Sequence, residues 1–248
     1  MRSLAAVSVV LAAWEIVSRA GYIPTALFPP PSAVVLAGIA WGRDGELLRD
    51  LAASVWRALA GYAIGSSAGL AAGIVTGRSA SVAAFTRPVL QGLRPLPPVA
   101  IVPLIIVWLG IGNAAKLFAI AFATFFPVWI AADIGARTIP EAHLWSAQLL
   151  GASRLRMFFA ISPPSAMTVA AGGLRTAMSL AFVMVFVSEL AGASRGIGYQ
   201  IATSQLAYRI DRMMAALAAL ALLGAAADAA LAWGIRTMMP WTRGARHD

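Results

Sequence analysis

Six long apolar stretches, separated by polar, charged or proline-rich segments, make up most of the sequence. They lie near residues 3–20, 56–77, 88–109, 115–136, 168–190 and 214–235. A helix needs roughly 20 mainly apolar residues to cross the hydrocarbon core of a bilayer, because it rises about 1.5 Å per residue. The pattern therefore predicts an all-α, polytopic membrane protein of about six transmembrane helices, with both termini on one side.

The segments between these stretches divide the chain. The stretch "GYIPTALFPPPSAV", residues 21–34, cannot be helical throughout, because proline lacks an N–H donor and restricts the residue before it. From Glu46 the sequence becomes helical and amphipathic. We expect residues 1–45 to form a first transmembrane helix and an external connection, 46–236 the main transmembrane domain, and 237–248 a basic cytoplasmic tail.

Glycine recurs every four residues in the second apolar stretch. The positions are Gly61, Gly65, Gly69, Gly73 and Gly77. Small residues at this spacing let the backbone of another helix approach closely within a membrane. The stripe therefore predicts a helix-packing surface, the alternative being that glycine is simply common in membrane helices.

The third apolar stretch opens with "LRPLPPVAIVP", whose prolines make one uninterrupted helix implausible. Irregular backbone at membrane depth survives only where protein or water satisfies its polar groups. Two interpretations stay open: the helix lines a pathway or packs inside a bundle, or residues 94–98 lie at the cytoplasmic interface.

The composition excludes a soluble domain. Hydrophobic residues make up 60% of the chain and charged residues only 12%, and the mean hydropathy is +0.80. The net charge of +9 comes almost entirely from arginines near the ends of the apolar stretches, which suits membrane anchoring better than nucleic-acid binding. More of these arginines share a side with the termini than face the other side, so we expect both termini in the cytoplasm.

Several catalytic chemistries lack the residues that they need. The chain has no cysteine, and its only lysine, Lys116, follows an alanine rather than the glycine of a phosphate-binding loop. His143 and His247 fall in predicted cytoplasmic segments without a histidine partner at helical spacing. An intramembrane enzyme would need a nucleophile with a base, or a cluster of metal ligands, within the helices.

The segment "PEAHLWSAQLLGASRLRMFF", residues 140–159, is amphipathic although it lies between apolar stretches. Pro140 suits the first turn of a helix, Gly151 can end that helix, and Pro163 and Pro164 stop a second short helix. We therefore expect a helix, a turn and a helix on the cytoplasmic face. Its apolar residues exceed what a solvated loop requires, so a partner must cover them. They are Leu144, Trp145, Leu149, Leu155, Phe158 and Phe159.

This segment resembles the cytoplasmic signature of the permease subunits of binding-protein-dependent ABC importers, of the type I (MetI-like) fold. In that signature a small-residue patch precedes a glycine, and an isoleucine and a proline follow. The matching positions here are Ala147, Gly151, Ile161 and Pro164. The signature's glutamate and first alanine are replaced by Trp145 and Ser146, and the leucine before the last proline is replaced by Pro163.

Three other stretches resemble the branch of that family that handles nitrate, sulfonates, taurine and bicarbonate. They are "FPPPSAV", "LRPLPPVAIVPLIIVWLGIG" and "GGLRTAMSLAFVMVFVSELAGASRGIGYQI". The resemblance covers nearly the whole chain, in the right order. It implies a permease subunit that moves a small solute across the bacterial inner membrane by alternating access, the solute being an oxyanion such as a sulfonate, taurine or nitrate, or a related small organic molecule.

The resemblance also implies the partners. Two ATP-binding cassette subunits would bind ATP and Mg²⁺, so that this chain itself carries no cofactor and no metal and is not an enzyme. A second permease chain, expected to be identical, and a periplasmic or lipid-anchored solute-binding protein would complete the assembly within membrane lipid, without nucleic acid. The segment that couples to the ATPase would comprise Trp145, Ser146, Ala147, Gly151, Ala152, Ser153, Arg154, Ile161 and Pro164.

Candidates for the translocation pathway come from charges and glycines near the fifth stretch. Glu189, Gly192 and Arg195 predict an external gate, the alternative being an ordinary interfacial charge pair. Arg175 and Arg94 are either ligands for an anionic solute or structural residues whose charge reaches the interface. A stand-alone channel or secondary transporter would also explain six helices and glycine packing, but not the amphipathic cytoplasmic segment.

Overall fold

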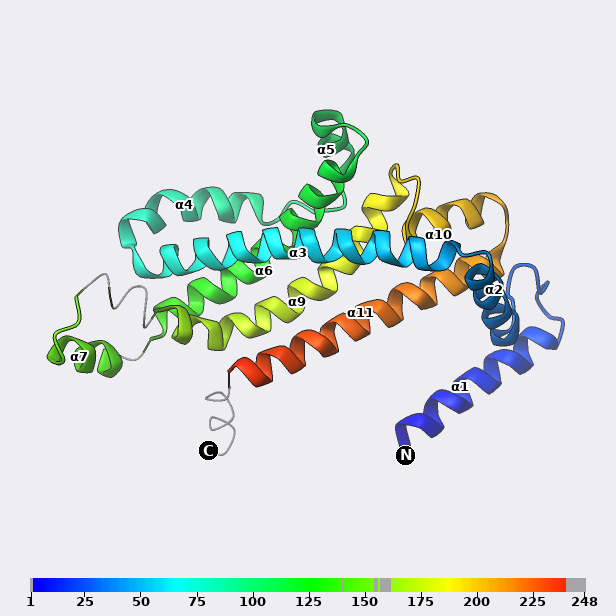
Figure 1. Cartoon of the computed structure of the whole chain (residues 1–248), viewed down its shortest axis with the longest axis horizontal. Helices are drawn as coiled ribbons and strands as arrows, with labels where there is room; N and C mark the ends of the chain where they lie inside the picture. The colour runs from blue at the N-terminus through cyan, green and yellow to red at the C-terminus, as the bar shows by residue number, and fades with distance from the viewer. Residues whose placement is uncertain (1, 140, 154–155, 157–161, 240–248) are drawn as a thin grey trace. The chain divides into compact units, whose positions relative to one another are not determined.

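The computed structural model describes residues 2–139, 141–153, 156 and 162–239, and its regular elements within these residues are helices (Figure 1). Its helices are α1 (Arg2–Arg19), α2 (Pro31–Arg43), α3 (Glu46–Arg78), α4 (Ala80–Leu93), α5 (Val102–Leu109), α6 (Asn113–Arg137), α7 (Glu141–Leu149), α9 (Ser162–Leu190), α10 (Ile197–Leu206) and α11 (Ile210–Met238). The chain divides into two compact units, one of Met1–Trp56 with Glu189–Leu223 and the other of Arg57–Ser188 with Gly224–Asp248. The predicted all-α class is confirmed.

Four of the described helices are long and apolar enough to cross a membrane, namely α3, α6, α9 from Ala166 onward, and α11. They correspond to the predicted stretches at 56–77, 115–136, 168–190 and 214–235, and α3 begins at the predicted Glu46. Helix α1 covers the predicted first stretch but is not among the four. Arg2, Glu15 and Arg19 leave only about twelve uncharged residues in a row within its 18.

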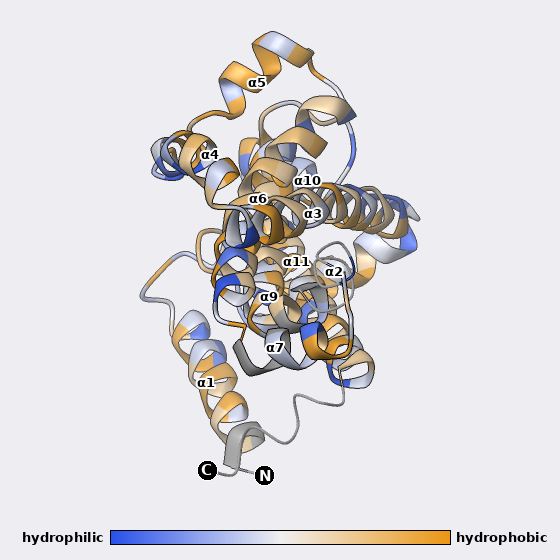
Figure 2. Ribbon diagram, turned by 90° about the vertical axis from the view of Figure 1, so that its left-hand side faces the viewer, coloured by the Kyte–Doolittle hydropathy of each residue, from blue (hydrophilic) through white to orange (hydrophobic). Residues whose placement is uncertain are grey.

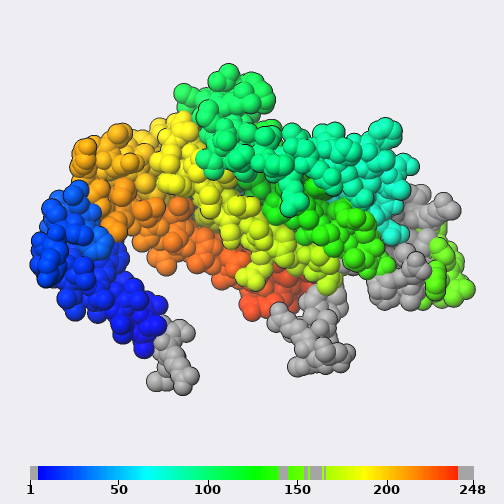
Figure 3. All heavy atoms as spheres, turned by 180° about the vertical axis from the view of Figure 1, so that it is seen from behind, coloured from blue at the N-terminus to red at the C-terminus, as the bar shows by residue number. Residues whose placement is uncertain are grey.

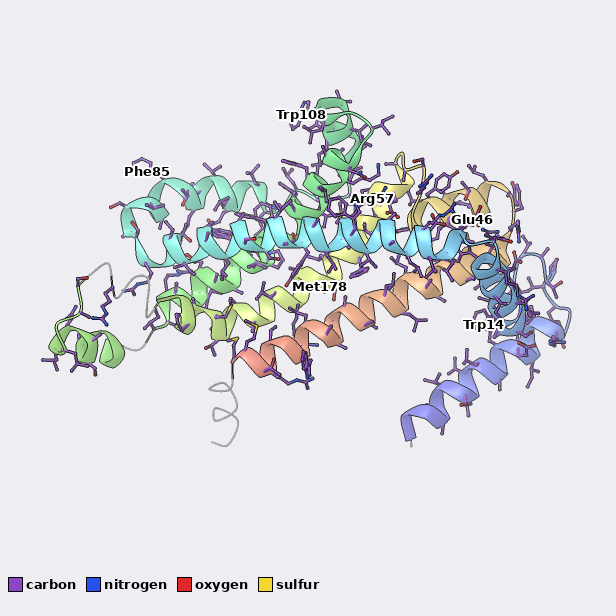
Figure 4. The ribbon with its side chains drawn as sticks, in the orientation of Figure 1. Trp14, Glu46, Arg57, Phe85, Trp108 and Met178 are labelled. Atoms are coloured by element: carbon purple, nitrogen blue, oxygen red, sulfur yellow. The ribbon has the colours of Figure 1, made fainter. Side chains whose placement is uncertain are left out.

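The proline-rich third stretch forms two helices, as its prolines predict. Helix α4 ends at Leu93, residues 94–101 are not helical, and α5 begins at Val102. Phe85 on α4 and Trp108 on α5 point away from the helices around them (Figure 4). Figure 3 shows both helices at the surface of their unit.

Two short helices differ from what the sequence pattern predicted. Helix α2 begins at Pro31, inside the stretch 21–34 that was expected to be an extended connection. Proline at the first helical position costs little, because the N–H of that residue has no partner within the helix. Helix α10 begins directly after Gly196 and includes Gly198, where the sequence pattern indicated a turn.

Helices α3 and α6 run side by side in the second unit (Figure 1), and the glycine stripe of α3 lies between them. A β-carbon on Gly61 would lie 2.6 Å from Ile120 Cβ, and one on Gly73 would lie 2.5 Å from Ala132 Cβ. A β-carbon on Gly77 would lie 2.6 Å from Ala136 Cβ. No real β-carbon tolerates such distances, so glycine is required for this close approach.

Helix α6 is also packed against α9. A β-carbon on Gly135 would lie 2.6 Å from Ala166 O, and one on Gly173 would lie 2.6 Å from Pro127 O. Half of the apolar window of α6 is buried, compared with 6% of that of α11. Helix α6 is therefore the most enclosed of the four long helices, and Figure 2 shows that the helices of this unit are mainly hydrophobic in colour.

Candidate functional site

Helix α7 carries the first residues of the predicted coupling segment, and its C-terminal end has a defined geometry. The N–H of Ala152 donates to Ala147 O at 2.9 Å, and that of Gly151 donates to Gln148 O at 2.9 Å. Gly151 has φ +78°. Together these features form a Schellman motif, in which a residue in the left-handed conformation ends a helix and satisfies its last carbonyl groups. The sequence thus requires glycine at position 151 for conformational reasons, since a β-carbon there would meet no other atom within 4 Å.

Large apolar side chains on and just after α7 are exposed. Trp145 is 60% exposed, Leu149 88% and Leu150 87%. Trp145 and Leu149 are four residues apart and so lie on one face of the helix. Because α7 is too short to span a membrane, this face needs a cover other than the hydrocarbon core.

The other residues of the predicted coupling segment are placed as follows. Ser146, Gly151, Ser153 and Pro164 are exposed, and Ala147 and Ala152 are partly buried. Arg154 and Ile161 lie outside the described residues, as does most of the predicted second short helix. Pro163 and Pro164 lie in the first turn of α9, which begins at Ser162, and so they start the next long helix. Proline is tolerated there because the first turn does not use its N–H.

A buried carboxylate joins three helices close to where α6 leads into α7. Asp133 on α6 accepts hydrogen bonds from Thr76 Oγ1 on α3, at 2.7 Å, and from Arg87 Nη2 on α4, at 3.0 Å. It also forms an ion pair with Arg137, one turn further along α6. Trp129 Nε1 donates to Thr76 Oγ1 at 3.2 Å. These contacts fix α3, α4 and α6 to one another at the end that carries α7.

A second buried carboxylate, that of Glu189, lies in the other unit. Its side chain is only 1% exposed. It accepts hydrogen bonds from Ser54 Oγ at 2.8 Å and from the N–H of Gly198 at 2.9 Å. Ser54 Oγ accepts in turn from the N–H of Ile197 at 2.8 Å. Glu189 therefore holds the start of α10 against α3.

The turn between Glu189 and α10 depends on its glycines. Gly192 has φ +139° and Gly196 has φ +129°, values that residues with a β-carbon rarely adopt. The N–H of Gly196 donates to Asp50 Oδ1 at 2.8 Å. Arg195, at the exposed side of this turn, lines a pocket of about 220 Å³ together with Glu46, Arg49, Asp50, Ser194, Tyr199 and Gln200. Of the predicted gate residues, Gly192 and Arg195 thus lie in this turn and Glu189 lies at the end of α9 just before it, where it contacts α3.

The two arginines proposed as solute ligands lie in different surroundings. Arg175 forms a two-pronged ion pair with Asp228 on α11, with Nε to Oδ1 at 3.0 Å and Nη2 to Oδ2 at 2.6 Å. Arg94 is exposed and caps the C-terminal end of α4. Within the described residues, no group of three or more His, Asp or Glu side chains could hold a metal ion.

Sequence reasoning missed the partners of these charges. Thr76, Ser54 and Asp50 look like ordinary polar residues of α3, and their partners are 57 to 146 residues away along the chain. One local signal was available: Asp133 and Arg137 stand four residues apart at the end of an apolar stretch, the spacing of an ion pair on a helix.

Comparison with known proteins places the chain in a family. The family described as "Binding-protein-dependent transport system inner membrane component" matches residues 65–239, which include α7 and all of α6, α9 and α11. The chain belongs to this family. It is therefore a multi-pass membrane permease of the MetI-like fold, as the resemblance of residues 140–164 implied.

Relatives with similar sequences are permeases of the same family. The chain is 34% identical over 232 residues to SsuC of Escherichia coli (strain K12), a permease protein named for aliphatic sulfonates transport, and the match covers 94% of this chain and 88% of SsuC. It is 29% identical over 244 residues to the taurine transport system permease protein TauC of the same organism, covering 96% and 89%. SsuC of Bacillus subtilis (strain 168) is 29% identical over 241 residues, covering 97% and 87%.

Proposed function

We propose that this permease is the membrane-spanning subunit of an ATP-driven importer for small sulfonates, such as taurine or an alkanesulfonate. The observation that carries the proposal is the similarity to SsuC and TauC along nearly the full length of the chain. Related oxyanions such as nitrate, or a small organic molecule, would use the same route. The positive charge of +9 is consistent with an anionic solute but does not select one.

The assembly that we propose contains two copies of this chain, two ATP-binding cassette subunits and a periplasmic or lipid-anchored binding protein. ATP and Mg²⁺ bind to the cassette subunits. Both termini and α7 face the cytoplasm of a bacterial cell, and the turn at 191–196 faces the periplasm. This orientation follows from the excess of arginine on the side of the termini.

In this assembly the exposed face of α7 docks on the ATPase. Trp145 and Leu149 fill an apolar groove on that partner, which removes them from water. When ATP closes the two cassette subunits, α7 moves with them and pulls on α6 and α9. The contacts of Asp133 make α3 and α4 follow α6, so the movement reaches a larger part of the permease than the two adjoining helices.

Replacing Gly151 by alanine is expected to weaken this coupling. A β-carbon at φ +78° costs about 1–2 kcal/mol, so the helix end leaves the Schellman geometry in a large fraction of molecules. We expect ATP-driven uptake to fall about tenfold, with unchanged membrane insertion. Uptake and ATPase activity of the purified complex, measured side by side, check this result.

The matched control is Gly21→Ala. Gly21 also has φ +78°, and a β-carbon on it would likewise meet no atom within 4 Å, so the backbone cost is the same. It lies in the connection between α1 and α2, away from the coupling segment. Equal losses of uptake in the two variants would mean that Gly151 acts only on stability.

In the other unit, we propose that the turn at 191–196 is part of an external gate. The turn is held closed by Glu189 and Asp50, and its glycines allow the backbone to change conformation. Each of these hydrogen bonds contributes about 1 kcal/mol net, and a buried polar group that loses its partner costs more.

Glu189→Gln is expected to loosen this turn while keeping the size of the side chain. If the closed state of the turn loses about 1 kcal/mol of stability, the ratio of open to closed molecules rises about fivefold. We expect ATP hydrolysis in the absence of the binding protein to rise by that factor. Ser188→Ala is the control, since among the described residues the hydroxyl of this buried neighbour donates to Val185 O on the same helix. If ATP hydrolysis were unchanged in Glu189→Gln, Glu189 would only stabilise the contact of α10 with α3 and would not control a gate.

Reconstitution tests the proposed function as a whole. The permease, purified with its ATPase into liposomes that contain ATP, should accumulate radiolabelled taurine or an alkanesulfonate only when the binding protein is added outside. Uptake that needs an ion gradient and no ATP would instead identify a secondary transporter. ATP-driven uptake of nitrate but not of sulfonates would correct the solute and keep the mechanism.

A further inference from the structure

The exposed face of α9 is polar along much of its membrane-spanning part. From position 168 to position 183 its exposed residues are Thr168, Val169, Gly172, Arg175, Thr176, Ser179 and Val183. With 3.6 residues per turn, all seven fall on one face of the helix. The hydroxyl groups of Thr168 and Ser179 have no hydrogen-bond partner among the described residues. This face therefore offers polar groups to whatever lies beside it.

The exposed face of α11 is different. Its exposed large residues include Leu217, Leu222 and Trp233, and most of the others are alanines. Such a surface is stable against lipid, where unsatisfied polar groups are costly. The two helices thus have different neighbours in the membrane. The apolar face of α11 is stable against lipid, whereas the polar face of α9 would be costly there.

Arg175 lies too deep to reach the membrane surface. Within the membrane-spanning part of α9, from Ala166 to Leu190, it lies about 13 Å from the start and about 22 Å from the end. The hydrocarbon core extends about 15 Å on each side of its centre, which is longer than an arginine side chain. A charge at this depth normally faces a protein partner or water.

The ion pair with Asp228 does not bury the side chain of Arg175. The arginine side chain remains 53% exposed and that of Asp228 30% exposed. A planar guanidinium group with two parallel hydrogen bonds is the arrangement that proteins use to bind carboxylates and other oxyanions. Asp228 therefore occupies, from within the chain, the position that an external oxyanion would take.

We propose that the polar face of α9 lines the aqueous route of the solute, and that Arg175 binds the anionic group of the solute in exchange for Asp228. This inference rests on the proposed import of a small oxyanion and names its binding residue. Without solute, Asp228 neutralises Arg175. When a sulfonate enters, its oxygens take the place of the carboxylate, and the hydroxyl group of Ser179, about one turn further along the helix, donates to it, whereas the hydroxyl group of Thr176 donates to Gly172 O.

The exchange also explains how the solute can leave. Binding in a transport pathway must be strong enough for entry and weak enough for release. Asp228 competes with the solute for the same guanidinium group, so its return displaces the anion. An arginine without such a partner would hold an oxyanion more tightly.

The natural absence of cysteine allows a direct test, because a single Ser179→Cys substitution gives one reactive thiol. The complex is placed in lipid nanodiscs, which leave both membrane faces open. Two thiol reagents are compared, the anionic 2-sulfonatoethyl methanethiosulfonate and its cationic trimethylammonium counterpart. The rate at which each reagent modifies the cysteine is divided by the rate at which the same reagent reacts with 2-mercaptoethanol, which corrects for the different reactivities of the two reagents. Leu222→Cys on α11 is the control, since Leu222 is 72% exposed and lies at mid-helix on the apolar face.

We expect the cysteine at position 179 to react, with a normalised preference for the anionic reagent of roughly tenfold, and the one at position 222 to stay unmodified. Adding Arg175→Gln should remove the preference, Arg175→Lys should retain most of it, and Asp228→Asn should increase it several-fold. Where the glutamine variant does not fold, the increase expected for Asp228→Asn, which keeps Arg175, serves as the test.

Two results would overturn the inference. If neither reagent modifies the cysteine at position 179, this face of α9 packs against protein or lipid. If both reagents react at equal normalised rates in all backgrounds, the face is wet but does not select anions. The labelling experiment needs only the folded complex and no transport. If the wild-type complex imported no sulfonate but the cysteine variants showed the expected labelling pattern, the proposed solute would be wrong. The assignment of this face of α9 to an aqueous route would then still stand.

Discussion

A permease with leucine in place of Gly69 is expected to fail to assemble. A β-carbon at this position would lie 2.6 Å from Phe125 O and 3.1 Å from Trp129 N, which are backbone atoms of α6 and cannot move aside. Forcing extra atoms into a packed interface typically costs about 1–3 kcal/mol, and a whole leucine against rigid backbone lies at or above the upper end. Helices α3 and α6 would have to separate along much of their length.

The yield of monodisperse complex in size-exclusion chromatography measures this effect, and we expect it to fall at least tenfold. Gly92→Leu provides the control, because Gly92 is also helical and has no atom within 4 Å of its position for a β-carbon. If Gly69→Leu assembled as well as Gly92→Leu, the glycine stripe would face lipid and the contact of α3 with α6 would be wrong.

The glycine stripe also illustrates how much of the fold can be predicted from the sequence. Five glycines in register identify a packing face without information from any other part of the chain. The pattern does not name the partner, because any helix with small residues would fit. The structure supplies α6, whose Ile120, Thr124, Ala132 and Ala136 stand opposite the stripe.

Long-range polar contacts were the part that the sequence could not predict. Asp133 and Glu189 stand near the ends of apolar stretches, where a carboxylate is usually solvated. In the structure both are buried, and each is paired with a hydroxyl group of α3, Thr76 in one case and Ser54 in the other. Burial of a carboxylate is tolerable only with such partners, and their positions depend on the packing of helices far apart in sequence.

Local signals were decisive for the end of α7. Gly151 was expected to end a helix, and α7 does end in a Schellman motif at that residue. The prolines at 163 and 164 lie in the first turn of α9, where proline is well tolerated, and the short helix that they were expected to stop lies mostly outside the described residues. Spacing alone does not distinguish the start of one helix from the end of another.

The second large effect is expected for Leu149→Asp. Leu149 makes few contacts within the chain, since it is 88% exposed, so the folded permease should be unaffected. At the proposed interface the variant loses the burial of a leucine and places an unpaired charge against an apolar groove. A loss of about 3 kcal/mol corresponds to more than a hundredfold weaker binding of the ATPase. The amount of ATPase that copurifies with tagged permease measures it.

Leu206→Asp is the matched control for this variant. Leu206 is 82% exposed and ends α10, outside the coupling segment. It introduces the same charge on an equally exposed surface, and we expect wild-type amounts of copurified ATPase. Equal losses in the two variants would point to general damage by a surface charge rather than to a docking face on α7.

The central claim is that energy enters this permease through α7, and one measurement addresses it most directly. A single cysteine in place of Leu149, in the naturally cysteine-free chain, is treated in native membranes with a short crosslinker that joins a thiol to an amine. The account predicts a crosslinked product that contains the ATP-binding cassette subunit, with a yield that changes when ATP is added. Absence of that product from position 149, in membranes where the ATPase copurifies with the permease, would contradict it.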